Sequence, residues 1–218
     1  MAGHVILIGL PGAGKTTVGR QLAWRLQLPF VDSDAVIEER LGCSIREFFE
    51  REGEEPFRDV EEAVLDELTR GEPCVLSTGG GAVLRPANRQ RLRARGRVFY
   101  LRSTPEELMR RLRHDRTRPL LQVADPLQRL RELHGVRDPL YRETAHYVIE
   151  TGRPSVATLV NMILMQLELG AEAARGVAPD ASLALATPTL HGGAAGAEAR
   201  RADLAGLAPS QAWRSVGL

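Results

Sequence analysis

A glycine-rich stretch near the start of the chain, GLPGAGKTT at residues 9–17, constrains the fold more than any other feature. It matches the pattern G-x-x-x-x-G-K-[ST] at Gly9, Gly14, Lys15 and Thr16. The short apolar run HVILIG precedes it, and KTTVGRQLAWRL, with apolar residues at helical spacing, follows it. A strand before this pattern and a helix after it form the context in which such a loop binds phosphate groups. We therefore predict a buried strand, a phosphate-binding loop and a helix, in that order.

The chemistry of phosphate binding accounts for the residue types in this loop. Gly9, Gly12 and Gly14 let the backbone turn and bring several N–H groups close to one phosphate, and the helix N-terminus adds partial positive charge. Lys15 is the only lysine in the chain, whose 29 basic residues otherwise comprise 28 arginines. A compact ammonium on a flexible stem can follow a moving phosphoryl group, whereas the planar arginine fork is larger. Thr16 offers a hydroxyl to Mg²⁺. The nucleotide-binding residues predicted here are Gly12, Ala13, Gly14, Lys15, Thr16 and Thr17.

Short apolar runs alternate with helix-like segments along the next 150 or so residues. Strands are expected at residues 4–9, 29–34, 74–81, 97–101 and 147–151. Helices are expected at residues 15–26, 34–42, 44–71 with breaks at Gly53 and Pro56, 85–96, 103–113, 125–145 and 153–169. This alternation predicts an α/β fold in three layers, with a parallel five-stranded sheet covered by helices on both faces.

The character of the chain changes after Gly170. Residues 171–218 are rich in alanine, glycine and proline, and their one aromatic residue is Trp213. Such a composition predicts a disordered tail, and an amphipathic helix near AEARRADLAGLA that docks loosely on the domain is the alternative. We therefore expect a folded domain at residues 1–170 and a tail at residues 171–218.

Charge and cysteine content exclude several classes of protein. The net charge of +1 indicates no general attraction to nucleic acid or membrane surfaces. Cys43 and Cys74 lie far apart without C-x-x-C spacing, which suits a reducing cytosol and gives no zinc site. The arginine-rich residues 85–118 could form an RNA-binding face, but they lack exposed aromatic residues for base stacking, which favours a solvated helix face. We expect a cytoplasmic monomer without a nucleic-acid or membrane partner.

Two motifs follow predicted strands, where ligands bind in a doubly wound sheet. Asp32 and Asp34 of DSD could hold a metal-bound water or accept a proton, and N-capping of the next helix by Ser33 or Asp34 is the structural alternative. The glycines of STGGG, at residues 77–81, indicate that the backbone passes close to a ligand or to a packed helix.

Two further motifs concern arginines. Arg58 and Glu61 are three residues apart on a predicted helix and can form an ion pair. The polar segment RHDRTRPLLQ, at residues 113–122, lies between two predicted helices and could close over bound phosphates as a lid.

Taken together, GLPGAGKTT, DSD, FRDVE, STGGGAVL, RPLL and RDPLYRE resemble the motifs of the shikimate kinase family, in that family's order and approximate spacing. The resemblance extends from about residue 4 to residue 170, and only the tail departs from it. It implies a P-loop kinase fold of the nucleoside monophosphate kinase type. It also implies an enzyme that uses ATP and Mg²⁺ to phosphorylate the 3-hydroxyl of shikimate.

The same resemblance implies roles for individual residues. The shikimate-binding residues would be Asp34, Arg58, Gly79, Gly80, Gly81 and Arg137. Asp34 would orient the attacking hydroxyl, and Glu61 would fix Arg58 against the substrate carboxylate. The remaining roles fall to Thr16 and Asp32 at Mg²⁺, Lys15 and the lid residue Arg118 at the phosphates, and Arg153 near the adenine. Arg113 and Arg116 both remain candidates for a further lid arginine.

Two other functions are compatible with a phosphate-binding loop on this fold. A kinase with a gluconate- or nucleotide-type acceptor is one, although R-x-PLY and the glycine triplet count against it. A non-catalytic ligand sensor is the other; such a sensor would be expected to carry a DNA-binding segment or to lack an acid or the lysine.

Overall fold

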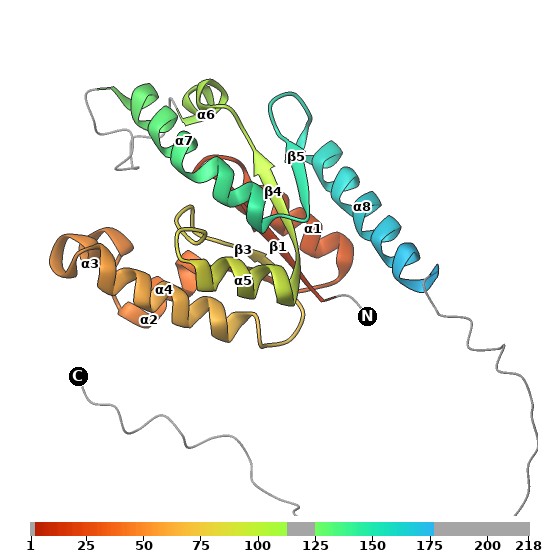
Figure 1. Cartoon of the computed structure of the whole chain (residues 1–218), viewed down its shortest axis with the longest axis horizontal. Helices are drawn as coiled ribbons and strands as arrows, with labels where there is room; N and C mark the ends of the chain where they lie inside the picture. Colours follow the sequence, from red (N-terminus) through yellow and green to blue (C-terminus); the bar gives the residue numbers. More distant parts are fainter. Residues whose placement is uncertain (1–2, 113–124, 177–218) are drawn as a thin grey trace, which may run out of the picture. The chain divides into compact units, whose positions relative to one another are not determined.

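The computed structural model describes residues 3–112 and 125–176 (Figure 1). The strands are β1 (His4–Ile8), β2 (Phe30–Asp32), β3 (Val75–Ser77), β4 (Gly96–Arg102) and β5 (Tyr147–Glu150). The helices are α1 (Lys15–Leu26), α2 (Ser33–Leu41), α3 (Ile45–Glu52), α4 (Glu54–Leu68), α5 (Pro86–Arg95), α6 (Pro105–Leu112), α7 (Pro126–Thr144) and α8 (Val156–Gly176). No helix in these described ranges is long and apolar enough to cross a membrane.

The five strands form one parallel sheet in the order β2-β3-β1-β4-β5, as the sequence predicts. All five residues of β1 are buried, because this central strand has neighbours on both edges and helices on both faces. The register pairs Leu7 with Ser77, and Ser77 with Asp32. The carboxyl ends of β1, β2 and β3 therefore lie level, and the loops that follow them meet at one edge of the sheet.

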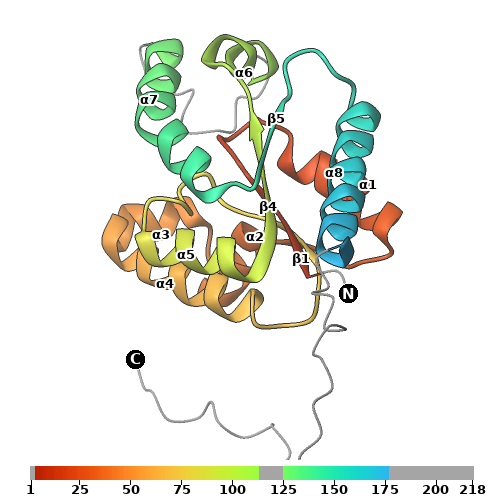
Figure 2. The same cartoon turned by 45° about the vertical axis from the view of Figure 1, so that its right-hand side comes forward.

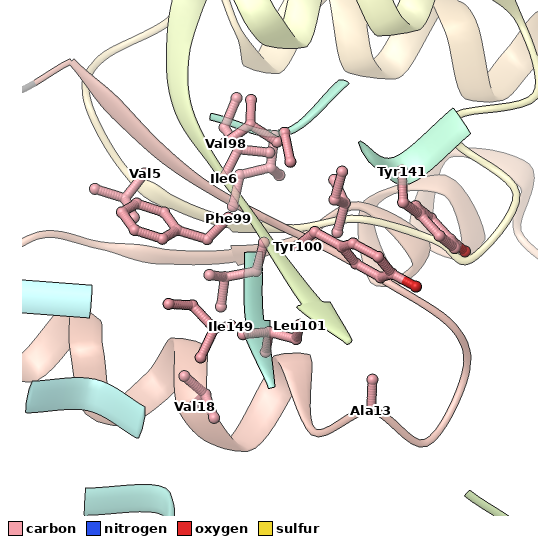
Figure 3. Close-up of a cluster of buried hydrophobic side chains, with 14 of the residues drawn as sticks. Val5, Ile6, Ala13, Val18, Val98, Phe99, Tyr100, Leu101, Tyr141 and Ile149 are labelled. Atoms are coloured by element: carbon pink, nitrogen blue, oxygen red, sulfur yellow. The ribbon is translucent and has the colours of Figure 1, made fainter. Parts of the chain in front are cut away.

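Two hydrophobic cores hold the helices in place. In the larger core, α1 and α8 pack on one face of the sheet, and α5 and α7 pack on the other (Figure 2). Buried side chains of β1 and β4 form its centre, where the rings of Tyr100 and Tyr141 lie side by side (Figure 3). The smaller core joins α2, α3 and α4 through Ile37, Phe48, Phe57 and Val64. Leu65 of α4 belongs to the larger core, so α4 joins this helical group to the rest of the fold.

The predicted strands and helices are all present, and the structure differs from the prediction in their bounds. Gly53, with a φ of 85°, separates α3 from α4 as predicted. The predicted break at Pro56 is wrong, because this proline lies in the first turn of α4, where a helical N–H has no intrahelical partner to lose. Helix α8 continues past residue 170 to Gly176. Residues 113–122 of the expected lid and residues 177–218 of the expected tail lie outside the described residues.

Candidate active site

The loops at the carboxyl ends of β1, β2 and β3 line two neighbouring cavities. The first, of about 380 Å³, lies over the phosphate-binding loop. The second, of about 800 Å³, lies between α2, α3, α4, the glycine loop after β3, and α7. Pro11, Asp34 and Gly80 line both cavities. We call the first the phosphate cavity and the second the acceptor cavity; they meet at these three residues.

The phosphate-binding loop adopts the backbone turns that its glycines allow. Gly9, Gly12 and Gly14 have φ angles of 147°, 85° and 95°, which L-residues rarely adopt. The ammonium of Lys15 donates to the carbonyl oxygens of Gly9, at 2.8 Å, and Leu10, at 3.1 Å. The lysine therefore lies against its own loop and lines the phosphate cavity.

Asp32 links the phosphate-binding loop to α2. Its Oδ2 accepts a hydrogen bond from Thr16 Oγ1 at 3.1 Å, and its Oδ1 accepts one from the backbone N–H of Asp34 at 3.2 Å. Asp32 is thus the N-cap of α2, so the alternative in which Ser33 or Asp34 caps this helix is wrong. The Ser33 hydroxyl instead accepts from the N–H of Gly79 at 3.1 Å.

A hydroxyl beside a carboxylate, both facing the phosphate cavity, is a donor set that Mg²⁺ accepts. In the part of the chain that the structure describes, no cluster of three His, Cys, Asp or Glu side chains could hold a metal ion. Mg²⁺ commonly takes one or two protein ligands and completes its shell with water and phosphate oxygens. Thr16 and Asp32 therefore fit a nucleotide-bound Mg²⁺ better than a metal held by protein alone.

Asp34 lies where the two cavities meet. Burial raises the pKa of its carboxyl to about 6, against the opposing effect of Lys15, while Asp32, Glu61 and Glu38 raise it further. A carboxyl with this pKa is ionised at neutral pH and is a stronger base than an exposed aspartate. It can accept a proton from a hydroxyl group that enters from the acceptor cavity.

Arg58 and Glu61 form the ion pair that their spacing predicts, and it is buried. Arg58 Nη1 donates to Glu61 Oε2 at 2.7 Å, and Arg58 Nη2 donates to Glu54 Oε1 at 2.8 Å. The guanidinium lies 5.2 Å from the ring centroid of Phe57, which fixes its plane. Burial raises the pKa of Glu61 although Arg58 opposes the shift. The acceptor cavity therefore presents a cation that the protein holds in one orientation.

The glycine loop is shaped by close approach rather than by unusual dihedral angles, since residues 79–81 have no φ in the left-handed region. A Cβ at Gly79 would lie 2.5 Å from Asp34 Oδ1, and one at Gly80 would lie 2.8 Å from Pro11 Cδ. A Cβ at Gly81 would collide with the guanidinium of Arg58. The sequence did not decide whether the three glycines make room for a ligand or for a packed helix. In the structure, they make room for side chains of the site itself.

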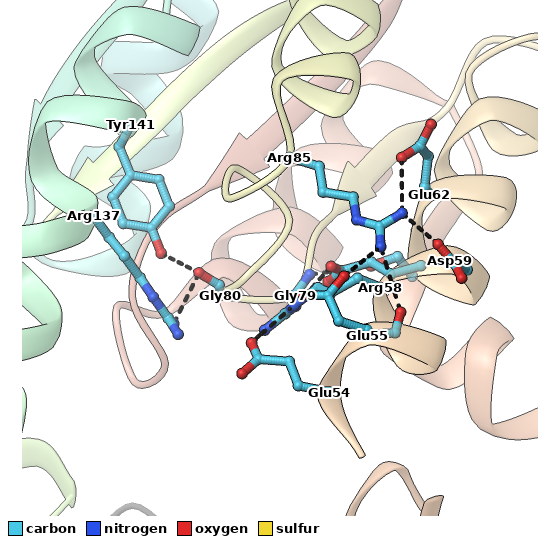
Figure 4. A network of polar contacts seen from close by, with 12 residues as sticks. Glu54, Glu55, Arg58, Asp59, Glu62, Gly79, Gly80, Arg85, Arg137 and Tyr141 are labelled. Atoms are coloured by element: carbon cyan, nitrogen blue, oxygen red, sulfur yellow. Dashed lines mark hydrogen bonds and ion pairs between the residues drawn. The ribbon is translucent and has the colours of Figure 1, made fainter. Parts of the chain in front are cut away.

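Both sides of the glycine loop are anchored to helices (Figure 4). From α7, Arg137 Nη1 and the Tyr141 hydroxyl both donate to the carbonyl oxygen of Gly80, at 3.1 Å and 2.6 Å. At the end of the loop, Arg85 binds carboxylates on successive turns of α4, including Asp59 at 2.6 Å and Glu55 at 3.0 Å. The loop therefore keeps its shape against α4 and α7 together.

The arginines of α5 pack between helices. Arg91 and Arg95 pair with Glu62 and Asp66 of α4, each at 2.8 Å. Arg93 Nη1 donates to the carbonyl oxygen of Ala145 after α7 at 2.6 Å. These side chains stay partly or fully exposed while they bind neighbouring elements, so the solvated face of α5 also holds this helix against α4 and the end of α7.

The structure brings most of the predicted site residues together, with exceptions. Ala13 is buried, lines neither cavity, and its N–H donates to the carbonyl oxygen of Leu10 at 3.1 Å. Arg153 lies in the described loop between β5 and α8, is exposed, and lies outside both cavities. Arg118, Arg113 and Arg116 fall outside the described residues. One residue that the sequence analysis missed is Arg111, which lines the phosphate cavity and donates to the Ser103 hydroxyl at 3.2 Å.

The sequence analysis also missed Tyr141, although its spacing from Arg137 could have identified it. It lies four residues after Arg137 in RDPLYRE, so the two side chains share one face of a helix. Phe49 and Ile45 of α3 line the acceptor cavity as well, but apolar residues on an amphipathic helix give no comparable signal.

Comparisons with known proteins agree with this geometry. Residues 11–168 match the profile of the family described as shikimate kinase. The shikimate kinase of Paracidovorax citrulli is 65% identical over 166 residues, covering 75% of this chain and 91% of that protein. That of Ralstonia nicotianae is 61% identical, covering 76% and 87%. The solved shikimate kinase from Acinetobacter baumannii in complex with shikimate is 48% identical, with a TM-score of 0.74 and coverage of 79% and 96%. The chain therefore belongs to the shikimate kinase family.

Proposed function

We propose that this chain transfers the γ-phosphoryl group of ATP to the 3-hydroxyl of shikimate, giving ADP and shikimate 3-phosphate. The observation that carries the proposal is the meeting of the phosphate cavity and the acceptor cavity at Asp34. Phosphoryl transfer needs the acceptor hydroxyl in line with the leaving group. Two adjoining cavities with a carboxylate at their junction meet that need, and family membership supports the choice of acceptor.

The acceptor cavity suits a small polyol with one carboxylate. Arg58 and Arg137 both line it and offer charge-assisted hydrogen bonds to a carboxylate. Asp34 lies on the same cavity and can accept hydrogen bonds from hydroxyl groups. Phe49 and Phe57 give it an apolar wall against which a ring can lie.

Mg²⁺ would be held by the hydroxyl of Thr16 and, through water, by the carboxylate of Asp32. When bound, it would neutralise charge on the phosphates. Lys15 would leave its loop carbonyls and follow the transferred group, since its ammonium is at the end of a flexible stem. Asp34 would orient the attacking hydroxyl and take its proton.

The remaining roles rest on the sequence resemblance. Arg118 would reach the phosphates from the lid, and Arg153 would lie near the adenine. We also expect the protein to act as a cytoplasmic monomer, without nucleic acid or membrane as a partner.

A coupled assay of ADP release tests the proposal. Purified protein with ATP and Mg²⁺ is given shikimate, gluconate or a nucleoside monophosphate in separate reactions. We expect turnover with shikimate alone. Turnover with gluconate or a nucleotide in its place would establish the alternative kinase, and binding of shikimate without ADP release would establish a sensor.

A further inference from the structure

Helix α7 carries one carboxylate, Asp138, that is directed at the sheet. Asp138 Oδ1 accepts hydrogen bonds from the Tyr100 hydroxyl at 2.9 Å and from Arg102 Nε at 3.2 Å, both on β4. Its Oδ2 accepts one from Arg142 Nε at 2.7 Å on the next turn of α7. The Asp138 side chain is only 15% exposed. These bonds from Arg142, Tyr100 and Arg102 hold the pKa of Asp138 below its usual value although burial opposes the shift.

The same strand residue contacts α7 at a second point. The ring of Tyr100 stacks on that of Tyr141 with centroids 4.8 Å apart (Figure 3). Tyr100 therefore binds α7 through its hydroxyl at Asp138 and through its ring at Tyr141, three residues along the helix. Two contacts at different places on one helix restrict both its rotation about its axis and its sliding along β4.

The orientation of α7 matters because the helix delivers two donors to the acceptor cavity. Arg137, the neighbour of Asp138 in the chain, and Tyr141 both donate to the carbonyl oxygen of Gly80. Arg137 also lines the acceptor cavity. A small rotation of α7 would move the guanidinium of Arg137 away from the place where a substrate carboxylate would bind, because this group lies at the end of a long side chain.

We infer that Asp138 is a positioning residue, whose hydrogen bonds to Tyr100 and Arg102 hold α7 against β4 in the orientation that points Arg137 at the bound substrate. The inference rests on the proposed function, since it concerns recognition of the shikimate carboxylate. Asp138 is not among the residues that line the acceptor cavity, so it acts on the substrate only through the orientation of α7.

The effect of positioning can be separated from the effect of charge by its sign. Asp138→Asn removes one negative charge close to Arg137, and this change alone would strengthen the attraction of the cavity for an anion. Loss of positioning would instead weaken binding of the carboxylate. A raised KM for shikimate in this variant therefore reports orientation and not electrostatics.

Steady-state kinetics of the full chain test the inference. In Asp138→Asn we expect the KM for shikimate to rise about tenfold, as for one charge-assisted hydrogen bond lost, with kcat and the KM for ATP within about twofold of native values. Tyr100→Phe keeps the stacked ring and removes only the hydroxyl donor, so its KM for shikimate should rise by less. Glu132→Gln is the matched control, because Glu132 is an exposed acid on α7 whose partner, Arg129, lies 3.2 Å away on the same helix.

Three results would overturn the inference: an unchanged KM for shikimate in Asp138→Asn, a lowered one, or equal losses for both substrates. Should Asp138→Asn fail to fold, Tyr100→Phe decides by the same criteria. An increase in KM for shikimate in Glu132→Gln as large as in Asp138→Asn would also overturn it. Lack of shikimate-dependent ADP release by the native chain is a different outcome, since it would overturn the proposed function first.

Discussion

The phosphate cavity and the acceptor cavity adjoin each other but are built in different ways. The phosphate cavity is built around one loop, residues 11–12 and 14–17, whose shape comes from backbone turns at positive φ, and residues at the ends of β2, β3 and α6 complete its lining. The acceptor cavity takes side chains from α2, α3, α4 and α7 together with the glycine loop. The main wall of the first is a loop that a short motif specifies, whereas the second exists only when four helices are in place.

This difference predicts different consequences of substitution. A change in the phosphate cavity should affect chemistry, because its groups act on the charge that moves during transfer. A change in the acceptor cavity should affect recognition, because its cations are held in place for a substrate carboxylate. Four predictions follow this division, from the largest expected effect to the smallest.

The largest effect is expected for Lys15→Arg in the phosphate cavity. The substitution keeps the charge but replaces a compact ammonium with a planar fork, so we expect kcat to fall by about 10² to 10³-fold. Circular dichroism and the melting temperature should stay near native values. Near-native turnover of a folded Lys15→Arg protein would show that charge alone is required at this position.

Asp34→Asn, at the junction of the cavities, should lower activity but raise the free energy of unfolding. The pKa of Asp34 is raised from 3.8 to about 6 on folding, so ionisation of the native state costs stability as the pH rises through this window. The kcat of the variant should fall by about 10²-fold. Without nucleotide, the variant should nevertheless be more stable than the native chain at pH 7, by about 2 to 3 kcal/mol. Denaturant titrations at several pH values measure this difference.

The gain should shrink as the pH falls below 6 and should vanish below 3.8, where the carboxyl is protonated in both the folded and the unfolded chain. A stability difference that is independent of pH would mean that Asp34 is not desolvated as described.

Arg137→Ala and Arg58→Ala should raise the KM for shikimate by about 10 to 100-fold, with much smaller changes for ATP, because each removes a charge-assisted contact to the carboxylate. Arg137→Ala is the cleaner test. Arg58→Ala also leaves Glu61 buried without its partner and should lower stability. Arg46→Ala, at an exposed ion pair on the same cavity, is the control. Equal losses for both substrates would mean that the acceptor site is misassigned.

The smallest effect is expected for removal of residues 177–218, which leaves α8 whole. The composition of this segment predicts that it adds nothing to either cavity. We therefore expect kcat and both KM values within about twofold of native values, and a melting temperature within a few degrees of the native one. A tenfold fall in turnover would show that the tail docks on the domain, as the helical alternative near AEARRADLAGLA requires.

The sequence predicted the phosphate-binding loop well because the information for this loop is local. A glycine with positive φ, a lysine and a hydroxyl in consecutive positions specify a loop whatever surrounds it. The same reasoning identified Asp32, Asp34 and the Arg58–Glu61 pair, although it gave the capping of α2 to the wrong residue. It predicted the break at Gly53 correctly but added a second break at Pro56. A proline in the first turn of a helix and a proline that ends a helix look alike in sequence.

Only the tertiary structure determined how the acceptor cavity is assembled. Arg137 and Tyr141 reach Gly80 across 57 and 61 residues of chain, and Tyr100 reaches Asp138 across 38. No periodicity encodes such contacts, because they depend on how helices pack on the sheet and not on neighbours in the chain. The sequence by itself therefore determined the fold class, the phosphate loop and the chemistry of the site. The packing of α4 and α7 around the glycine loop determined where that chemistry is directed.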